Sequence, residues 1–435
     1  MRRGATDAVM VSRGDAETRR VCPKGRGSFR ATLSTSHVPW PKAKLGEVAI
    51  EFIDGDRGKN YPKQHDFSSK GHCLFLNAEN VTSEGFKFDA LKFISEEKDH
   101  SLRKGKVSRG DVILTTRGTV GNAAIYDEDV PFANVRINSG MVILRCDNRK
   151  VLPSYLYFCL QTQDFLSQVN GFKSGVAQPQ LPIKDLKQIE IPIPPLPVQR
   201  RIADILSAYD DLIENNRRRI ATLEEAARLA YRKWFGGEVG RKATLGKVSD
   251  FFDISIGRTP PRKSEECFSH DLSDVKWLSI KDMKAGRVFA FDSSERLTGL
   301  GVEKTKIHVS PPGTIFLSFK LTVGVVVIAG DYMATNEAIA HFETDDRALR
   351  DYTYFYLSLF QYDKLGSTSA IAKAINSDII RKMDFVLPNR ASLGSYEKEV
   401  EPMFDQIENL TRQSAALAAA RDMLLPRLMK GEMSL

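Results

Sequence analysis

The chain has 435 residues, 42% of them hydrophobic, which is too long for one ordinary core and suits two domains of about 150 residues with connecting segments. No stretch approaches the ~20 apolar residues of a membrane span, and no apolar segment follows the basic N-terminus, so we expect neither a membrane nor a secreted protein but a cytoplasmic one. The formal net charge is +8, but residues 1–30 hold eight basic and three acidic residues, so the remaining chain is only +3 and any DNA-binding surface must be local.

Residues 1–38 are rich in Arg, Gly, Ser and Thr and show no sustained hydrophobic period. This composition is typical of a disordered tail, so we expect such a tail or an overlong translation start, without a function of its own. Regular patterns begin at Trp40.

From Trp40 onward the sequence resembles itself at an offset of about 200 residues. Leu45-Gly46-Glu47-Val48 recurs as Leu245-Gly246-Lys247-Val248, and Asn134 matches Asn336. Gly110-Asp111-Val112-Ile113-Leu114 recurs as Gly313-Thr314-Ile315-Phe316-Leu317. The sequence therefore predicts two copies of one domain, residues 39–197 and 241–394, each followed by a helix.

Within each copy, short runs rich in Val, Ile, Phe and Thr are broken by Gly, Asp and Asn, which predicts strands and turns. One helical stretch per copy is expected, near residues 154–169 and 351–365. The pattern favours an α+β domain dominated by its sheet.

The segment 198–236 predicts a long helix, because Pro194, Pro195 and Pro197 precede it and Gly236-Gly237 follow it. At ~1.5 Å per residue it would be ~55 Å long and would need a partner. Asn216 is expected to set its register. The seam of apolar, small and polar residues repeats every three or four positions: Ile202, Ile205, Tyr209, Leu212, Asn216, Ile220, Leu223, Ala227, Ala230 and Trp234.

Residues 395–431 predict the partner helix, and Pro402 indicates that the helix starts or restarts there. An antiparallel, coiled-coil-like pair would place the two domains at opposite ends, related by a pseudo-twofold axis. The predicted fold is thus α+β, with two repeated sheet-dominated domains joined by two long antiparallel helices. The seam of this second helix comprises Val400, Met403, Ile407, Leu410, Ser414, Leu417, Leu424 and Leu428.

Several motifs resemble the specificity subunits of Type I restriction-modification enzymes. The stretches are Pro195-Leu196-Pro197-Val198-Gln199-Arg200-Arg201-Ile202-Ala203-Asp204-Ile205-Leu206, Asp210-Asp211-Leu212-Ile213-Glu214-Asn215-Asn216, Trp234-Phe235-Gly236, Leu424-Leu425-Pro426-Arg427-Leu428-Met429-Lys430-Gly431, and Gly257-Arg258-Thr259-Pro260 followed by Trp277-Leu278-Ser279-Ile280-Lys281-Asp282. The resemblance spans residues 40 to 431. It has no counterpart for the N-terminal tail, and the second copy has Ala374-Ile375 where the first has Gln178-Pro179-Gln180-Leu181.

The resemblance implies a subunit without catalysis that reads a split site on double-stranded DNA, with one domain, a target recognition domain, for each half. It also implies that two modification methyltransferase subunits bind the spacer helices and that restriction translocase subunits join them. The subunit itself would hold no cofactor, since S-adenosylmethionine, ATP and Mg²⁺ would be bound by those partner subunits.

Sequence signatures of catalysis and metal binding are not found. There is no Asp/Asn-Pro-Pro-Tyr/Phe stretch for an adenine methyltransferase and no phosphate-binding Gly-x-x-x-x-Gly-Lys-Ser/Thr. The five cysteines form no Cys-x-x-Cys pair, and the seven histidines are scattered singly, so we expect no zinc site and no disulfide framework. Asp54-Gly55-Asp56 and Glu96-Glu97-Lys98 suggest nuclease carboxylates only superficially, and turn residues or a solvated charge cluster are the simpler interpretation.

Base recognition needs donors and acceptors on loops, and polar loop residues of each copy are the candidates. The alternative for each is an ordinary polar turn. Residues that differ between the copies are better candidates for sequence choice than residues that repeat. The predicted DNA contacts are Arg57, Lys59, Asn60, Thr116, Arg117, Arg136, Asn138, Lys173, Ser174 and Gln178 in the first copy, and Arg258, Thr259, Lys281, Ser318, Lys320, Asn336 and Lys373 in the second.

Two alternatives remain at this point. The chain could be a non-catalytic dimeric scaffold whose helices pair between chains, or a nuclease fused to recognition domains, for which no additional domain is evident. On the long helix, Arg217-Arg218-Arg219 could contact spacer phosphates, form a solvated face, or contact the methyltransferase subunit.

Overall fold

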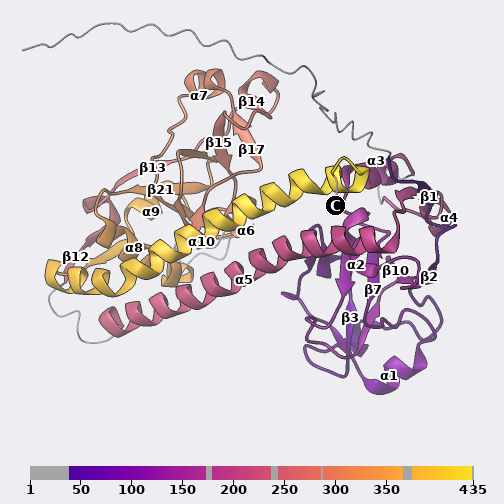
Figure 1. Ribbon diagram of the computed structural model, residues 1–435. Helices are drawn as coiled ribbons and strands as arrows, with labels where there is room; N and C mark the ends of the chain where they lie inside the picture. The colour runs from indigo at the N-terminus through magenta and orange to yellow at the C-terminus, as the bar shows by residue number, and fades with distance from the viewer. Residues whose placement is uncertain (1–38, 173–178, 237–242, 286–287, 366–374, 434–435) are drawn as a thin grey trace, which may run out of the picture. The chain divides into compact units, whose positions relative to one another are not determined.

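A computed structural model describes residues 39–172, 179–236, 243–285, 288–365 and 375–433 (Figure 1). Within these ranges the chain forms two α+β domains and two long helices, as the sequence predicts. Among the described residues, no helix combines the length and the apolar character needed to cross a bilayer.

The first domain is built on a four-stranded antiparallel sheet in the order β2-β10-β7-β8, formed by Ile50–Asp54, Met141–Cys146, Asp111–Thr115 and Ala123–Tyr126. A smaller sheet has the order β6-β3-β9, with β3 (Cys73–Leu76) parallel to β9 (Val135–Ile137) and antiparallel to β6 (Phe93–Ile94). β4 (Val81–Thr82) and β5 (Gly85–Phe86) form a hairpin, and β1 (Lys42–Lys44) pairs with β11 (Glu190–Pro192). The helices are α1 (Glu96–Ser101), α2 (Pro153–Cys159), α3 (Gln163–Phe172) and α4 (Ile183–Leu186).

The second domain repeats this topology. Its larger sheet has the order β13-β21-β18-β19-β16, formed by Asp253–Ile256, Ile339–Glu343, Ile315–Ser318, Val326–Ala329 and Phe289–Ala290. Its smaller sheet has the order β14-β17-β15-β20, formed by Phe268–Ser269, Glu295–Leu297, Val275–Leu278 and Met333–Thr335, again with one parallel pair, β15 and β20. β12 (Thr244–Lys247) pairs with β22 (Asp384–Leu387), and the helices are α6 (Ile280–Ala285), α7 (Gly299–Thr305), α8 (Arg347–Leu359) and α9 (Ser377–Arg381).

The shared strand order confirms that the domains are copies of one fold, and it corrects one sequence match. β9 and β20 are equivalent strands, and Asn138 and Asn336 are the residues that directly follow them. Each side chain accepts a hydrogen bond from the backbone N–H two residues later, that of Gly140 at 2.8 Å and that of Ala338 at 3.0 Å. Asn336 therefore corresponds to Asn138 and not to Asn134.

The long helices α5 (Leu196–Phe235) and α10 (Arg390–Lys430) pack on each other within one chain (Figure 1). Ion pairs join Asp210 to Arg421 and Lys233 to Glu399, so the start of one helix meets the end of the other and the pair is antiparallel. Asn216 is buried in α5, whereas Leu212, which the seam also predicted, is 51% exposed.

Helix α10 begins at Arg390, where the Asn389 side chain caps it, and continues through Pro402. The expected start or restart at Pro402 is therefore wrong. Proline inside a helix costs ~3 kcal/mol, but Val400 and Phe404, which flank Pro402, are both buried in the core of the second domain. This packing holds the helix across the missing hydrogen bond.

Each domain packs on a different part of the helix pair. Ile202, Ala203 and Leu206 of α5 belong to the core of the first domain, together with Leu425, Leu428 and Met429 of α10. Ile220, Ala227 and Ala230 of α5 belong to the core of the second domain, together with Leu393 to Leu410 of α10. The helices are thus part of both cores.

Candidate nucleic-acid interface

Three loops of the first domain meet at one end of its larger sheet. They follow β2 (residues 55–60), connect β7 to β8 (116–122) and follow β9 (138–140), and we call them the convergent loops. Arg57 donates from Nη2 to the carbonyl oxygen of Ser139 at 3.3 Å. The backbone N–H groups of Thr116 and Arg117 donate to the carbonyl oxygen of Gly140 at 2.7 and 3.1 Å.

A glycine brings these loops into contact in both domains. A Cβ on Gly55 would lie 2.1 Å from the carbonyl oxygen of Asn138, and one on Gly257 would lie 2.2 Å from that of Asn336. No side chain fits at either position without moving the backbone. The second domain therefore has the same convergent loops, at residues 257–260, 319–325 and 336–338.

The connecting hairpins of the two domains are also held in the same way. Thr115 Oγ1 donates to the carbonyl oxygen of Thr119, and Ser318 Oγ donates to that of Thr322 at 2.7 Å. Phe319 N–H donates to the carbonyl oxygen of Ala338 at 2.9 Å, as Thr116 N–H does to that of Gly140. Ser318 is thus the counterpart of Thr115, and Lys320 is the counterpart of Arg117.

On this shared framework the outward side chains differ. Counting from the two glycines, Arg57 corresponds to Thr259; counting from the two asparagines, Ser139 corresponds to Glu337. In the second domain Thr259 Oγ1 donates to Glu337, and this hydrogen bond, together with the positive charge of Lys320, lowers the pKa of the Glu337 carboxyl group. At these three positions the first domain thus has two arginines and a serine, whereas the second has a threonine, a glutamate and a lysine.

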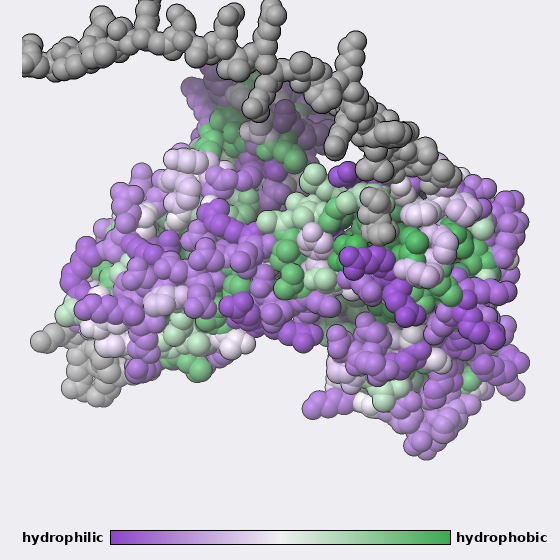
Figure 2. All heavy atoms as spheres, in the orientation of Figure 1, coloured by the Kyte–Doolittle hydropathy of each residue, from purple (hydrophilic) through white to green (hydrophobic). Residues whose placement is uncertain are grey.

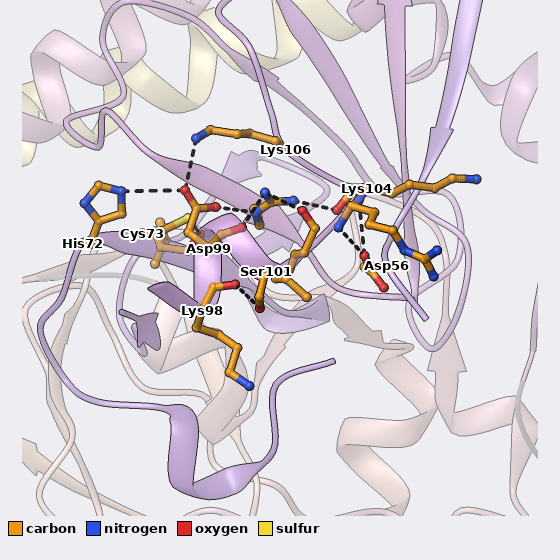
Figure 3. Close-up of polar contacts among 12 residues, drawn as sticks. Asp56, His72, Cys73, Lys98, Asp99, Ser101, Lys104 and Lys106 are labelled. Carbon is orange, nitrogen blue, oxygen red and sulfur yellow. Dashed lines mark hydrogen bonds and ion pairs between the residues drawn. The ribbon is translucent and has the colours of Figure 1, made fainter. Parts of the chain in front are cut away.

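Two basic residues beside the convergent loops of the first domain were missed by sequence reasoning. Arg103 and Lys104 are exposed, and their backbone N–H groups donate to Asp56 Oδ2 at 2.7 and 3.2 Å (Figure 3). Burial raises the pKa of Asp56, but these bonds and one from Gly58 N–H outweigh it and keep the pKa below its ordinary value. The Asp56 carboxylate thereby ties the loop with Arg57 and Lys59 to the turn with Arg103 and Lys104.

The structure corrects the expectation for Arg136. Its side chain is buried against the fully buried Asp99, and it also donates to the carbonyl oxygens of Lys104 at 2.7 Å and Leu102 at 3.2 Å. Lys106 donates to the other Asp99 oxygen at 3.0 Å, and His72 lies 3.6 Å from it (Figure 3). Burial raises the pKa of Asp99, but the hydrogen bonds from Arg136 and Lys106 leave it below its ordinary value. Arg136 therefore links strand β9 to helix α1 and to the turn after that helix, and its side chain does not face solvent.

Two predicted hydroxyl contacts are corrected for the same reason. Thr116 is 6% exposed and Ser318 is fully buried, and the Ser318 hydroxyl is occupied by the hairpin bond described above. Both residues position the hairpins that carry the exposed side chains of Arg117 and Lys320. Asn138 and Asn336 are half-buried, and their side chains shape the turns after β9 and β20.

The remaining predicted residues fall into two groups. Thr259 is half-buried, and the other described residues are exposed: Arg57, Lys59, Asn60, Arg117, Arg258, Lys281 and Lys320. Lys281 lies on α6, which contacts the second hairpin, since Lys284 Nζ donates to Thr322 Oγ1 at 3.0 Å. Lys173, Ser174, Gln178 and Lys373 lie outside the described residues.

A cavity of about 520 Å³ between the first domain and the two long helices has the wrong charge for DNA. Its lining includes Glu84, Asp127, Asp210, Asp211 and Glu214, with only Arg217 and Arg421 as cations. Arg217 pairs with Glu84 and Glu214, and Arg218 pairs with Glu214. These two arginines of the helix are therefore partly neutralised by carboxylates of this chain.

The fold also brings together histidines that the sequence places apart. Atoms of His308, His341 and Glu343 lie within 4.8 Å of one another, although the two histidines are 33 residues apart in the sequence. The Ser310 hydroxyl lies 3.0 Å from both His341 Nδ1 and Glu343 Oε1, and Thr335 Oγ1 lies 2.6 Å from His341 Nε2. Burial lowers the pKa of His341 to about 3, so its ring is neutral, and both ring nitrogens already have hydroxyl partners.

Comparisons with known proteins agree on one family. Residues 37–225 match the family model described as Type I restriction modification DNA specificity domain. The chain is 22% identical to the Type I restriction enzyme HindI specificity subunit of Haemophilus influenzae, covering 88% of this chain and 99% of that protein. It is 25% identical to the MjaIX specificity subunit of Methanocaldococcus jannaschii, covering 75% of this chain and 78% of the relative. A crystal structure of the Type I restriction-modification S subunit from M. genitalium has the same fold, with a TM-score of 0.54, 15% identity, and coverage of 91% and 97% of the two chains.

Proposed function

We propose that this chain is a specificity subunit of a Type I restriction-modification system, and that its convergent loops are the surfaces that read DNA, one half-site per domain. The observation that carries this proposal is the comparison of equivalent loop positions in the two domains. Buried residues that shape the loops repeat in both domains, whereas the outward residues at equivalent positions differ. Two readers of unlike half-sites require this combination.

The exposed side chains suit base edges and phosphates. An arginine such as Arg57 or Arg117 can donate two hydrogen bonds to a guanine, and Glu337 can accept one from the amino group of cytosine. Lys59, Arg103 and Lys104 form a basic border that suits phosphates, which fix position without reading sequence. The net charge of the whole chain is not needed for this interaction, because the positive charge is concentrated beside the loops.

The helix pair suits a spacer of fixed length. Ala203 lies in the core of the first domain and Ala227 in that of the second, 24 positions later on α5, which corresponds to ~36 Å of helix. One turn of B-DNA is ~34 Å, the separation at which two half-sites face the same side. A continuous helix built into both cores resists changes of this separation.

We infer that the chain itself performs no chemistry and that the methyltransferase subunits dock on the helix pair. Large apolar side chains on the helices face solvent: Leu212 is 51% exposed, Leu229 56% and Met423 71%. The face of the molecule in Figure 2 is mostly hydrophilic, with apolar side chains gathered around the C-terminal end of α10 and around α3. Exposed apolar side chains on otherwise polar helices are typical of protein interfaces. Methyl transfer and translocation would then belong to the partner subunits, together with S-adenosylmethionine, ATP and Mg²⁺.

The test is reconstitution with modification subunits, followed by mapping of methylated adenines and DNA footprinting. The expected result is no methylation by the isolated chain and methylation of one split sequence with a fixed gap by the complex. Arg117→Ala should relax selection in one half-site only, and the matched variant Lys320→Ala should relax it in the other. Methylation by the isolated chain, or a single unbroken footprint, would contradict the proposal. A scaffold that pairs its helices between chains would give no footprint at all.

A further inference from the structure

The hairpin between β18 and β19 carries an unusual residue at its tip. Leu321 is fully exposed and has a φ of 61°, in the left-handed region that L-residues with large side chains avoid. Its counterpart in the first domain, one residue after Arg117 as Leu321 is one after Lys320, is Gly118 with a φ of 73°. The first domain thus uses the residue that the backbone favours, and the second domain does not.

Nothing in the fold of the second domain explains this leucine. A side chain that is fully exposed buries no apolar surface, so it adds no packing to the core and only adds strain to the turn. Glycine at this position would keep the same turn without strain, as Gly118 does. A strained, exposed apolar residue at a loop tip points to a contact made outside the chain.

The surroundings of Leu321 indicate what that contact is. The residue before it, Lys320, is exposed, and Lys284 of α6 reaches the hairpin through its bond to Thr322 Oγ1. Lys281 of the same helix is exposed as well. Leu321 is therefore an exposed apolar side chain with lysines close to it on the hairpin and on α6. This combination suits a negatively charged polymer that also carries an apolar group. Duplex DNA offers one in the major groove, the 5-methyl group of thymine, which proteins recognise with apolar side chains.

We propose that Leu321 contacts the methyl group of one thymine in the half-site read by the second domain, and that Gly118 leaves the first half-site without the matching contact. The inference rests on the proposed function, because it takes the convergent loops as the DNA-reading surface. Lys320 and Lys284 would bind phosphates or base edges beside the methyl group, and the left-handed turn would hold the leucine at the front of the hairpin.

The experiment measures DNA affinity of the complex with the modification subunits once the split site has been mapped. Each thymine of the second half-site is replaced singly by deoxyuridine, which lacks only the methyl group. We expect one replacement to weaken binding of the wild-type complex about fourfold, the value of one buried methyl-sized group. Leu321→Ala and Leu321→Gly should bind the mapped site more weakly and be indifferent to that replacement.

Leu321→Gly also separates function from folding. Because glycine relieves the left-handed strain, its melting temperature should equal or exceed that of the wild type while its discrimination between thymine and deoxyuridine is lost. The matched control, Gly118→Leu, should lower the melting temperature and create no new thymine preference in the first half-site.

Equal discrimination by wild type and Leu321→Gly would overturn the inference while leaving a split footprint, and with it the proposed function, intact. Loss of subunit assembly in Leu321→Gly would also overturn it, since the leucine would then be a protein contact. Absence of any split footprint would instead mean that the proposed function is wrong.

Discussion

Replacing Arg136 by methionine tests the distinction between a residue that supports the loops and one that reads DNA. Methionine keeps the apolar stem but removes the ion pair to Asp99 and the hydrogen bonds to the carbonyl oxygens of Lys104 and Leu102. Removal of one partner from a buried ion pair costs ~3–5 kcal/mol. Lys106 and His72 still face Asp99, which favours the lower end of that range, and the two carbonyl groups add ~1 kcal/mol each. We therefore expect Arg136→Met to lose roughly 5 kcal/mol of stability.

The assay combines thermal unfolding with DNA binding by the reconstituted complex. For a domain of this size ~5 kcal/mol corresponds to a fall in Tm of about 15 °C. The exposed Arg117 gives the matched comparison: Arg117→Met should leave Tm within about 2 °C, weaken specific binding ~10-fold and lower the salt dependence of binding if a phosphate is among its contacts. An Arg136→Met protein that kept its Tm and lost DNA affinity would refute the assignment of Arg136 to the interior.

Three further predictions concern the parts that hold the loops and domains in place. Gly55→Ala and Gly257→Ala should each weaken recognition of one half-site only, because the added Cβ pushes the loop after β2 or β13 away from the turn after β9 or β20; methylation mapping of each variant measures this. Gln199→Leu should destabilise the chain by ~2–4 kcal/mol in denaturant unfolding, because the fully buried Gln199 amide bonds Leu152 N–H and the carbonyl oxygens of Lys150 and Pro194. Glu397→Gln should stabilise the chain by roughly 1–3 kcal/mol at pH 8 and by much less at pH 5, measured as Tm against pH.

The sign of the last prediction follows from proton uptake. Burial and the nearby negative charge of Asp351 together raise the pKa of Glu397 to about 7, so the folded chain holds a proton that the unfolded chain releases above its ordinary pKa of 4.5. Stability is therefore lost as the pH rises from about 4.5 to 7, and glutamine, which carries no charge, avoids that loss. A pH-independent difference between the two proteins would contradict this reasoning. For the other variants, Gln188→Leu, an exposed change, serves as a neutral control.

Sequence reasoning predicted the large features because they depend on long-range repetition. The apolar runs around Gly110 and Gly313, and the spacing along α5, survive differences in loop length, so two copies and two paired helices could be predicted. The predicted helix start at Pro402 was wrong because the low helix propensity of proline is outweighed by the packing of Val400 and Phe404. No local sequence pattern reveals this packing. The resemblance to Type I specificity subunits could be predicted because its motifs are spread over residues 40 to 431.

The candidate site was predicted less well, and the reasons are specific. The first copy has asparagines at 134 and 138 and only the backbone shows which one corresponds to Asn336. The strand Val135–Ile137 is buried on both faces, so alternation could not show that Arg136 points inward. Arg103 and Lys104 gave no signal in the repeat, and only the bonds to Asp56 place them beside Arg57.

The two domains separate the residues that build the loops from the residues that the loops present. Gly55 and Gly257 allow close contact with the turn after β9 or β20, Asn138 and Asn336 form that turn, and the hydroxyls of Thr115 and Ser318 brace the hairpin. None of these bonds involves an exposed side chain, and exposed substitutions usually change stability by less than ~0.5 kcal/mol. The residues at the tips can therefore change without loss of the fold. A chain built in this way can acquire a new half-site in one domain while the helix pair and the other domain keep their geometry.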